Sequence, residues 1–256
     1  MSNLSARVDL WRGRALALSS LGRVGRHAHS AGAVLLGLDG DFAIRARGRA
    51  WLRTRQAYIP ARTLHELDCG ETRMLTLYLA PGRLDARQLC ARWDLELDEL
   101  APSPRSEGEL LELASAHARG MIDAADLVSA LDRFIGGREP ARLGVEERVE
   151  TIAAQILGAP VRTPPLASLA ARVGLSPSRL RHVFSERAGV SIRALRRWQR
   201  MRAIGHHVAL GASLTEAAHA QGFSDSAHLS RDFRAAFGIP PSRVFARGAT
   251  VRVHTR

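Results

Sequence analysis

The chain has 256 residues, which is enough for one large domain or two smaller ones with a buried core. Its composition is 46% hydrophobic and 24% charged, as in ordinary globular proteins, and no apolar run of about 18 residues indicates a membrane span. Cys69 and Cys90 are too few for a disulfide framework, and the N-terminus lacks the order of a signal peptide. We therefore expect a cytoplasmic protein.

The basic residues are unevenly distributed along the chain. All 37 of them are arginine, and residues 1–150 contain 21 arginines and 21 acidic residues. Residues 151–256 contain 16 arginines and only 4 acidic residues, so the whole net charge of +12 lies there. A segment this basic is suited to a polyanion, and nucleic acid is the first candidate. The alternative is a basic surface that serves solubility.

The first half of the chain changes from strand-like to helix-like patterns. Residues 27–80 alternate short apolar runs with Gly, Pro and Asp, which predicts a small antiparallel barrel or sandwich. Apolar residues then recur every three or four positions over 84–99, 107–119 and 123–135, which predicts helices. The helices of Asp85–Ile135 either pair two copies of the chain or pack on the barrel.

A change in composition marks the boundary between two parts. The segment GGREPARLG at 136–144 is rich in Gly, Pro and charge, and the chain after it has a helical pattern. We therefore predict a sensor and dimerisation domain at 1–137, a linker at 138–145 and an all-helical domain at 146–256.

The basic half contains an internal repeat of 48 to 49 residues. Ala170-x3-Gly174-Leu175-Ser176 recurs as Ala218-x3-Gly222-Phe223-Ser224, and Leu180-x3-Phe184-x4-Gly189 recurs as Leu229-x3-Phe233-x4-Gly238. Each copy has a short helix, a turn and a second helix with Leu and Phe on one face, which is the pattern of a helix-turn-helix. Residues 191–210 predict one long helix that joins the two copies.

Local signals support these helix boundaries. Ser176 followed by Pro177 predicts a helix start, and Ser213 with Glu216 predicts a capping box. The expected helix ends are Gly189 and Gly238, which can adopt the left-handed conformation.

The motifs RVGLSPSRLRHVFSERAGVS and AAHAQGFSDSAHLSRDFRAAFGIPPSRVFA resemble the two helix-turn-helix units of AraC/XylS-type transcription regulators. The resemblance covers about residues 146–247. It implies that the second helix of each unit enters the major groove, so that one chain reads two adjacent groove segments about 34 Å apart.

The DNA-contacting residues are expected on the outward faces of these second helices. The candidates on these faces are Ser178, Arg179, Arg181 and His182 in the first unit, and Ser226, Ala227, Ser230 and Arg231 in the second. The resemblance to the family adds His228 as a further base-contacting position. Arg181 and Arg231 are the main candidates for base readout, because an Arg–guanine pair is the commonest specific contact. His228 either bonds a phosphate or bonds the neighbouring turn.

Residues 25–81 resemble the cupin-type sensor domain that is often fused to such regulators. The resemblance includes His27-x-His29 and His65, which can meet inside a barrel as three imidazole ligands of Zn, Ni, Fe or Cu. The glutamate of the cupin pattern is absent, since no carboxylate lies between Ala31 and Leu38. The alternatives are a bound divalent metal and a metal-free pocket that holds a small molecule or is purely structural.

The sequence thus predicts an α+β protein, with a cupin-like antiparallel barrel and following helices before an all-α domain of two helix-turn-helix units. The expected function is that of a non-enzymatic, bacterial, sequence-specific transcription regulator. Its expected partners are promoter DNA, a small-molecule effector, RNA polymerase and a second copy of the chain. The alternatives are a cupin metalloenzyme (a dioxygenase or isomerase) with a basic accessory domain and, ranked last, a DNA-repair protein with a reactive thiol.

Overall fold

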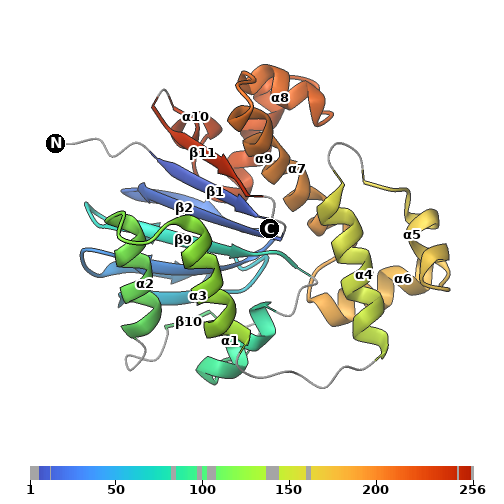
Figure 1. Cartoon of the computed structure of the whole chain (residues 1–256), viewed down its shortest axis with the longest axis horizontal. Coiled ribbons are helices and arrows are strands. Elements are labelled where there is room, and N and C mark those ends of the chain that lie inside the picture. Colours follow the sequence, from blue (N-terminus) through green and yellow to red (C-terminus); the bar gives the residue numbers. More distant parts are fainter. Residues whose placement is uncertain are drawn as a thin grey trace.

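The computed structural model describes residues 6–11, 13–81, 85–96, 100–102, 108–136, 144–159, 163–246 and 248–254. Most of the predicted linker at 138–145 lies outside these residues. Figure 1 shows a sheet-rich half, helices that cover one face of its large sheet, and a helical half beside it.

The N-terminal half is built from two sheets. The seven-stranded sheet has the order β10-β7-β4-β9-β2-β1-β11, and the four-stranded sheet has the order β3-β8-β5-β6. The strands of the first sheet are β1 (Arg7–Trp11), β2 (Arg14–Ser20), β4 (Gly32–Gly37), β7 (Gln56–Ile59), β9 (Arg73–Leu79), β10 (Ala101–Pro102) and β11 (Thr250–Val253). Those of the second are β3 (Arg23–His27), β5 (Phe42–Ala46), β6 (Leu52–Thr54) and β8 (His65–Asp68).

Both sheets contribute apolar side chains to one shared core. Leu35 and Ile59 of the large sheet form a buried cluster with Phe42, Ile44 and Leu67 of the small sheet. Alternate residues of a strand point to the same face, so each strand supplies every second residue to this core. The strands predicted within 27–80 are confirmed. β1 and β2 lie before residue 27, outside the region in which the sequence pattern predicts strands.

Three helices cover the outer face of the seven-stranded sheet: α1 (Asp85–Trp93), α2 (Gly108–Ala118) and α3 (Ala124–Gly136). Leu110 and Leu131 of these helices share a buried cluster with Leu16 and Leu77 of the sheet. Of the two roles left open for this apolar stripe, the structure therefore shows packing on the barrel.

The second half contains α4 (Gly144–Gly158), α5 (Leu166–Arg172), α6 (Pro177–Ala188), α7 (Ile192–Ala209), α8 (Leu214–Ala220), α9 (Ser226–Phe237) and α10 (Pro241–Val244). The predicted helix ends are confirmed. Ser176 caps α6, and Ser213 and Glu216 form the capping box of α8. Gly189 and Gly238 end α6 and α9 in the left-handed conformation, with φ of 69° and 72°.

The expectation of purely helical structure after residue 146 is wrong at the C-terminus. Thr250–Val253 forms β11, which pairs in parallel with β1 at the edge of the seven-stranded sheet (Figure 1). The physical reason is that the β1 edge offers unpaired backbone groups, which a four-residue strand satisfies without any helix-like pattern of its own. In the described parts of the chain, no helix is long and apolar enough to cross a membrane.

Candidate functional site

Each helix-turn-helix unit packs around buried apolar side chains. In the first unit, Leu169 of α5 packs with Leu180 and Phe184 of α6. In the second, Ala217 of α8 shares a buried cluster with Phe233 of α9. The repeat of Leu and Phe thus buries one face of α6 and one face of α9, and leaves the opposite faces available for contact.

The candidate DNA-contacting residues lie on these opposite faces. Ser178, Arg179, Arg181, His182, Ser226, Ala227 and Arg231 are exposed, and His228 and Ser230 are half-buried. The Arg181 guanidinium donates to the backbone oxygen of Pro177 in its own helix, at 3.3 Å. Both main candidates for base readout therefore lie on solvent-facing helix surfaces.

His228 bonds the neighbouring turn, which was one of its two expected roles. Its Nδ1 lies 3.2 Å from the Ser224 hydroxyl, and its ring lies edge-on to Phe223 with centroids 5.1 Å apart. Asp225 caps α9 by accepting from the backbone N–H of His228. These contacts fix the start of α9.

Arginines on α7 link this helix to both units. Arg196 donates to the backbone oxygen of Pro164, which precedes α5. Arg197 donates to the backbone oxygen of Asp232 in α9. Arg200 donates to the backbone oxygen of Gln221 after α8, and its guanidinium lies 4.0 Å from the ring centroid of Phe223. The two units are therefore held on one common helix.

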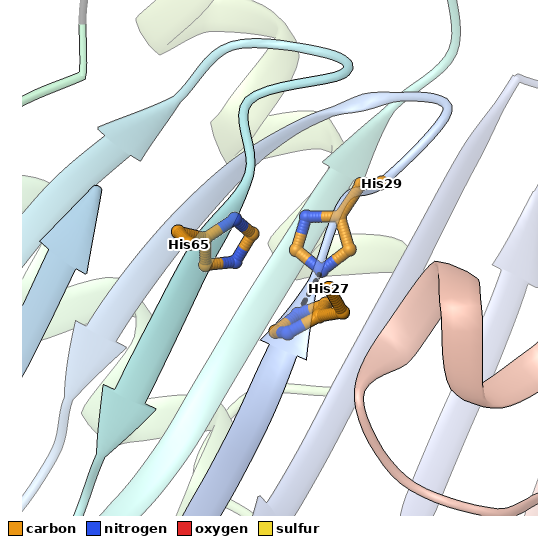
Figure 2. A group of neighbouring side chains, drawn as sticks. All are labelled: His27, His29 and His65. Atoms are coloured by element: carbon orange, nitrogen blue, oxygen red, sulfur yellow. Dashed lines mark hydrogen bonds between the residues drawn. The ribbon is translucent and has the colours of Figure 1, made fainter. Parts of the chain in front are cut away.

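In the barrel, His27, His29 and His65 converge from the end of β3, the following loop and the start of β8 (Figure 2). One ring nitrogen of each lies within 4.8 Å of those of the other two, and all three residues are at most 3% exposed. His27 and His65 are paired across β3 and β8. The predicted meeting of the three imidazoles is confirmed.

Hydrogen bonds define which nitrogens face one another. Nδ1 of His27 donates to the backbone oxygen of Gly25, and Nδ1 of His65 donates to that of Thr63, both at 2.8 Å. Their Nε2 atoms therefore carry lone pairs. Nε2 of His27 lies 3.1 Å from Nε2 of His29. Nδ1 of His29 and Nε2 of His65 are buried and have no hydrogen-bond partner among the described residues.

Burial keeps these imidazoles neutral. It is the main cause that lowers the pKa of His27 to about 3, with the charge of a protonated His65 as the next cause. Burial likewise lowers the pKa of His29 well below its usual value, and lowers that of His65. A transition metal binds histidine through the lone pair of a neutral imidazole nitrogen. The three inward-facing imidazoles therefore have the chemistry of metal ligands.

An apolar cavity of about 330 Å³ lies between the barrel and the helical half. Its walls include His29 and Tyr78 of the barrel, Trp198 of α7 and Phe237 of α9. The Tyr78 centroid lies 5.5 Å from that of Trp198 and 5.7 Å from that of Phe237. No local signal in the sequence shows that Phe237 faces the barrel as well as its own helix-turn-helix unit.

Comparison with known proteins supports both halves of this description. Residues 169–247 match a helix-turn-helix domain. No curated protein matches the sequence. Among solved structures, ToxT from Vibrio cholerae O395 is similar, with a TM-score of 0.59 and 11% identity over 91% of this chain and 97% of that chain.

Two further ToxT structures are similar to the chain. Wild-type Vibrio cholerae ToxT with a bound unsaturated fatty acid has a TM-score of 0.56 and 11% identity, over 96% of each chain. ToxT bound to a methylnaphthalenyl-butenoic acid has a TM-score of 0.58 and 11% identity, over 91% of this chain and 98% of that chain. The predicted α+β architecture is thus confirmed: residues 169–247 match a helix-turn-helix domain, and the chain has the fold of ToxT.

Proposed function

We propose that this chain is a sequence-specific DNA-binding transcription regulator. The observation that carries the proposal is the pair of helix-turn-helix units on a single helix, α7, with exposed arginines on the outward faces of α6 and α9. In such units the second helix enters the major groove. Arg181 and Arg231 each offer a guanidinium for bidentate contact with a guanine.

The joining helix sets the distance between the two contacts. α7 has 18 residues, about 27 Å of helix at 1.5 Å per residue. Major-groove segments on one face of DNA repeat about every 34 Å. The arginines of α7 contact both units and so hold α6 and α9 in a fixed relative position. This favours insertion of both helices into the major groove together.

The barrel half is proposed to bind an apolar small-molecule effector in the cavity of about 330 Å³. The cavity is lined from both halves, so an occupant contacts β-strands and the helices of the DNA-binding domain together. A ligand shifts a conformational equilibrium only if it binds one state more tightly than the other. A ligand in a cavity between the two halves meets this condition, because it contacts both halves only when they are docked. The bound acids in the ToxT structures support an apolar acid as effector class.

The histidine triad is proposed to hold a divalent transition metal: Zn, Ni or Fe. His27, His29 and His65 would supply three nitrogen ligands and leave a coordination position open for an oxygen or nitrogen donor. His29 would give up its contact with His27, because both Nε2 atoms must then face the metal. The cupin-enzyme alternative is less favoured for two reasons. The triad lacks the carboxylate of the cupin pattern, and the exposed arginines of α6 and α9 are suited to binding a polyanion.

A homodimer in the bacterial cytoplasm completes the proposal, with RNA polymerase as a further partner. Paired subunits match the two-fold symmetry of many operators. Sedimentation of the purified protein with and without its DNA site tests the oligomeric state.

Selection of DNA from a random pool tests the regulator function directly. The proposal predicts a long consensus in two parts, spaced by one helical turn of about 10–10.5 base pairs. Recovery of DNA without any sequence preference would show that the basic half binds polyanions non-specifically, and would refute the proposal.

A further inference from the structure

We propose that the groove between the barrel and the start of α7 is a second ligand site, which binds a small molecule with several anionic oxygens, such as a tricarboxylate or a phosphate ester. The groove has a volume of about 1040 Å³ and lies apart from the apolar cavity, with which it shares only His29 among its lining residues. Ligand pockets of proteins span roughly 300–1,000 Å³. The groove therefore has room for a whole small molecule.

The charge of the groove selects an anion. Five arginines line it, and Asp232 is the single carboxylate among its described lining residues. The arginines are Arg62 from the turn before β8 and Arg193, Arg196, Arg197 and Arg200 from α7. The N-cap residue Ser191 also lines the groove, so the positive end of the 18-residue helix α7 faces the same space.

Arg62 of the barrel and Arg193 of α7 both line the groove. Within the described parts of the chain, neither side chain has a hydrogen-bond or ion-pair partner, and both are exposed. Arg62 adopts a left-handed backbone conformation with φ of 68°, which is uncommon for a residue with a Cβ atom. Its N–H donates to the backbone oxygen of His29 at 2.7 Å, which holds this turn at the groove.

The other three arginines have unused donors. Within the part of the chain that the structure describes, Nε of Arg196, Nε of Arg197 and Nη2 of Arg200 are buried and have no hydrogen-bond partner. Burial lowers the pKa of Arg196 and is the main cause that lowers the pKa of Arg200. The partial removal of these guanidinium groups from water therefore costs free energy. A bound anion would offset this cost, because charge-assisted bonds from guanidinium to carboxylate or phosphate are strong and often bidentate.

An anion in the groove would bridge the two halves of the molecule. Arg62 belongs to the barrel and Arg193 to the helix that joins the DNA-binding units, so both contacts form only when the halves are docked. The ligand therefore stabilises the docked arrangement. This anion site is distinct from the two other proposed sites, the apolar cavity and the histidine triad.

The test uses the full-length protein with citrate and inorganic pyrophosphate as probes, at constant ionic strength set with sodium chloride. We expect a saturable rise in melting temperature and a measurable heat of binding for the wild type. Arg62→Gln and Arg193→Gln should each weaken probe binding at least about tenfold, which corresponds to about 1.4 kcal/mol. The matched control is Arg119→Gln, an exposed arginine after α2, which should bind the probes as the wild type does.

Two results would overturn the proposal. One is an effect of citrate and pyrophosphate that does not saturate, or that is equal in wild type and in both variants, since this would be ionic screening. The other is a uniform loss of DNA affinity in Arg62→Gln with unchanged probe binding, which would make the groove a contact for DNA phosphates. A protein that binds citrate through Arg62 yet selects no DNA sequence would retain the anion site and refute the regulator function instead.

Discussion

Gly238 of the second helix-turn-helix unit lies directly against His27 of the barrel. A Cβ atom on Gly238 would fall 2.7 Å from Nδ1 of His27 and 2.8 Å from the backbone oxygen of Gly25, which accepts the hydrogen bond of that same Nδ1. The backbone N–H of Ala28 also donates to the backbone oxygen of Ala235 in α9, at 3.2 Å. The C-terminal end of α9 thus packs against the end of β3, beside the histidine triad.

Gly238→Ala should loosen this contact. The substitution places a Cβ atom in a left-handed conformation, at a cost of about 1–2 kcal/mol, and forces apart α9 and β3, at a further cost of about 1–3 kcal/mol. Gly189→Ala is the matched control, because Gly189 ends α6 in the same conformation and a Cβ there would meet nothing within 4 Å. Denaturant titration of both variants gives the difference in free energy of unfolding. Equal losses of unfolding free energy in the two variants would show that the contact between α9 and β3 does not contribute to stability.

His254→Ala should destabilise the protein, although His254 lies directly after β11 at the end of the described residues. Its Nε2 donates to Oδ1 of Asp9 at 2.9 Å, and Asp9 is fully buried in β1. Burial would raise the pKa of Asp9, but His117, His254 and Arg7 outweigh it and lower this pKa. Loss of a hydrogen bond to a buried carboxylate costs about 1.5–3 kcal/mol.

A double-mutant cycle separates this bond from other losses. If His254 acts through Asp9, the effects of His254→Ala and Asp9→Asn on the free energy of unfolding should be non-additive. Additive effects would contradict the contact between His254 and the buried carboxylate of Asp9.

Local features of the fold were predictable from the sequence, and non-local ones were not. The caps at Ser176, Ser213, Gly189 and Gly238 depend on neighbouring residues, so the sequence alone predicts them. The convergence of the three histidines was predictable from strand alternation and a resemblance. The pairing of β11 with β1, the position of Phe237 against the barrel and the arginine groove depend on how distant segments pack. No short-range pattern encodes these.

The neutral histidines predict acid sensitivity of the metal-free protein. The folded pKa of His27 is about 3, whereas the unfolded value is near 6.5, so the unfolded state binds more protons between these values. The free energy of unfolding should therefore fall as pH drops below about 6.5, by about 1.4 kcal/mol per pH unit for each such histidine. His27→Gln should show a shallower slope in denaturant titrations at pH 7 to 5. The exposed-residue control His219→Gln should keep the wild-type slope, and an unchanged slope in His27→Gln would contradict the assignment.

The metal proposal predicts that purified protein takes up Zn or Ni and that His29→Ala loses it. The two remaining imidazoles hold a labile metal poorly. His219→Ala is the control because His219 is exposed on α8 and is not part of the triad. Elemental analysis after dialysis gives the metal content per chain. Full occupancy in His29→Ala, or wild-type protein that binds neither metal, would leave the triad as a structural cluster of the barrel.

The most direct measurement is DNA selection from a random pool with the wild type, Arg181→Ala and Arg231→Ala, with Arg119→Ala as the control. The account predicts a two-part consensus for the wild type and the control. Each recognition-helix variant should lose base preference in one part only, with about 1–3 kcal/mol less affinity for the selected site and nearly unchanged non-specific binding. Loss of affinity for all sequences alike, or a wild-type pool without a consensus, would contradict the central claim that α6 and α9 read adjacent segments of one site.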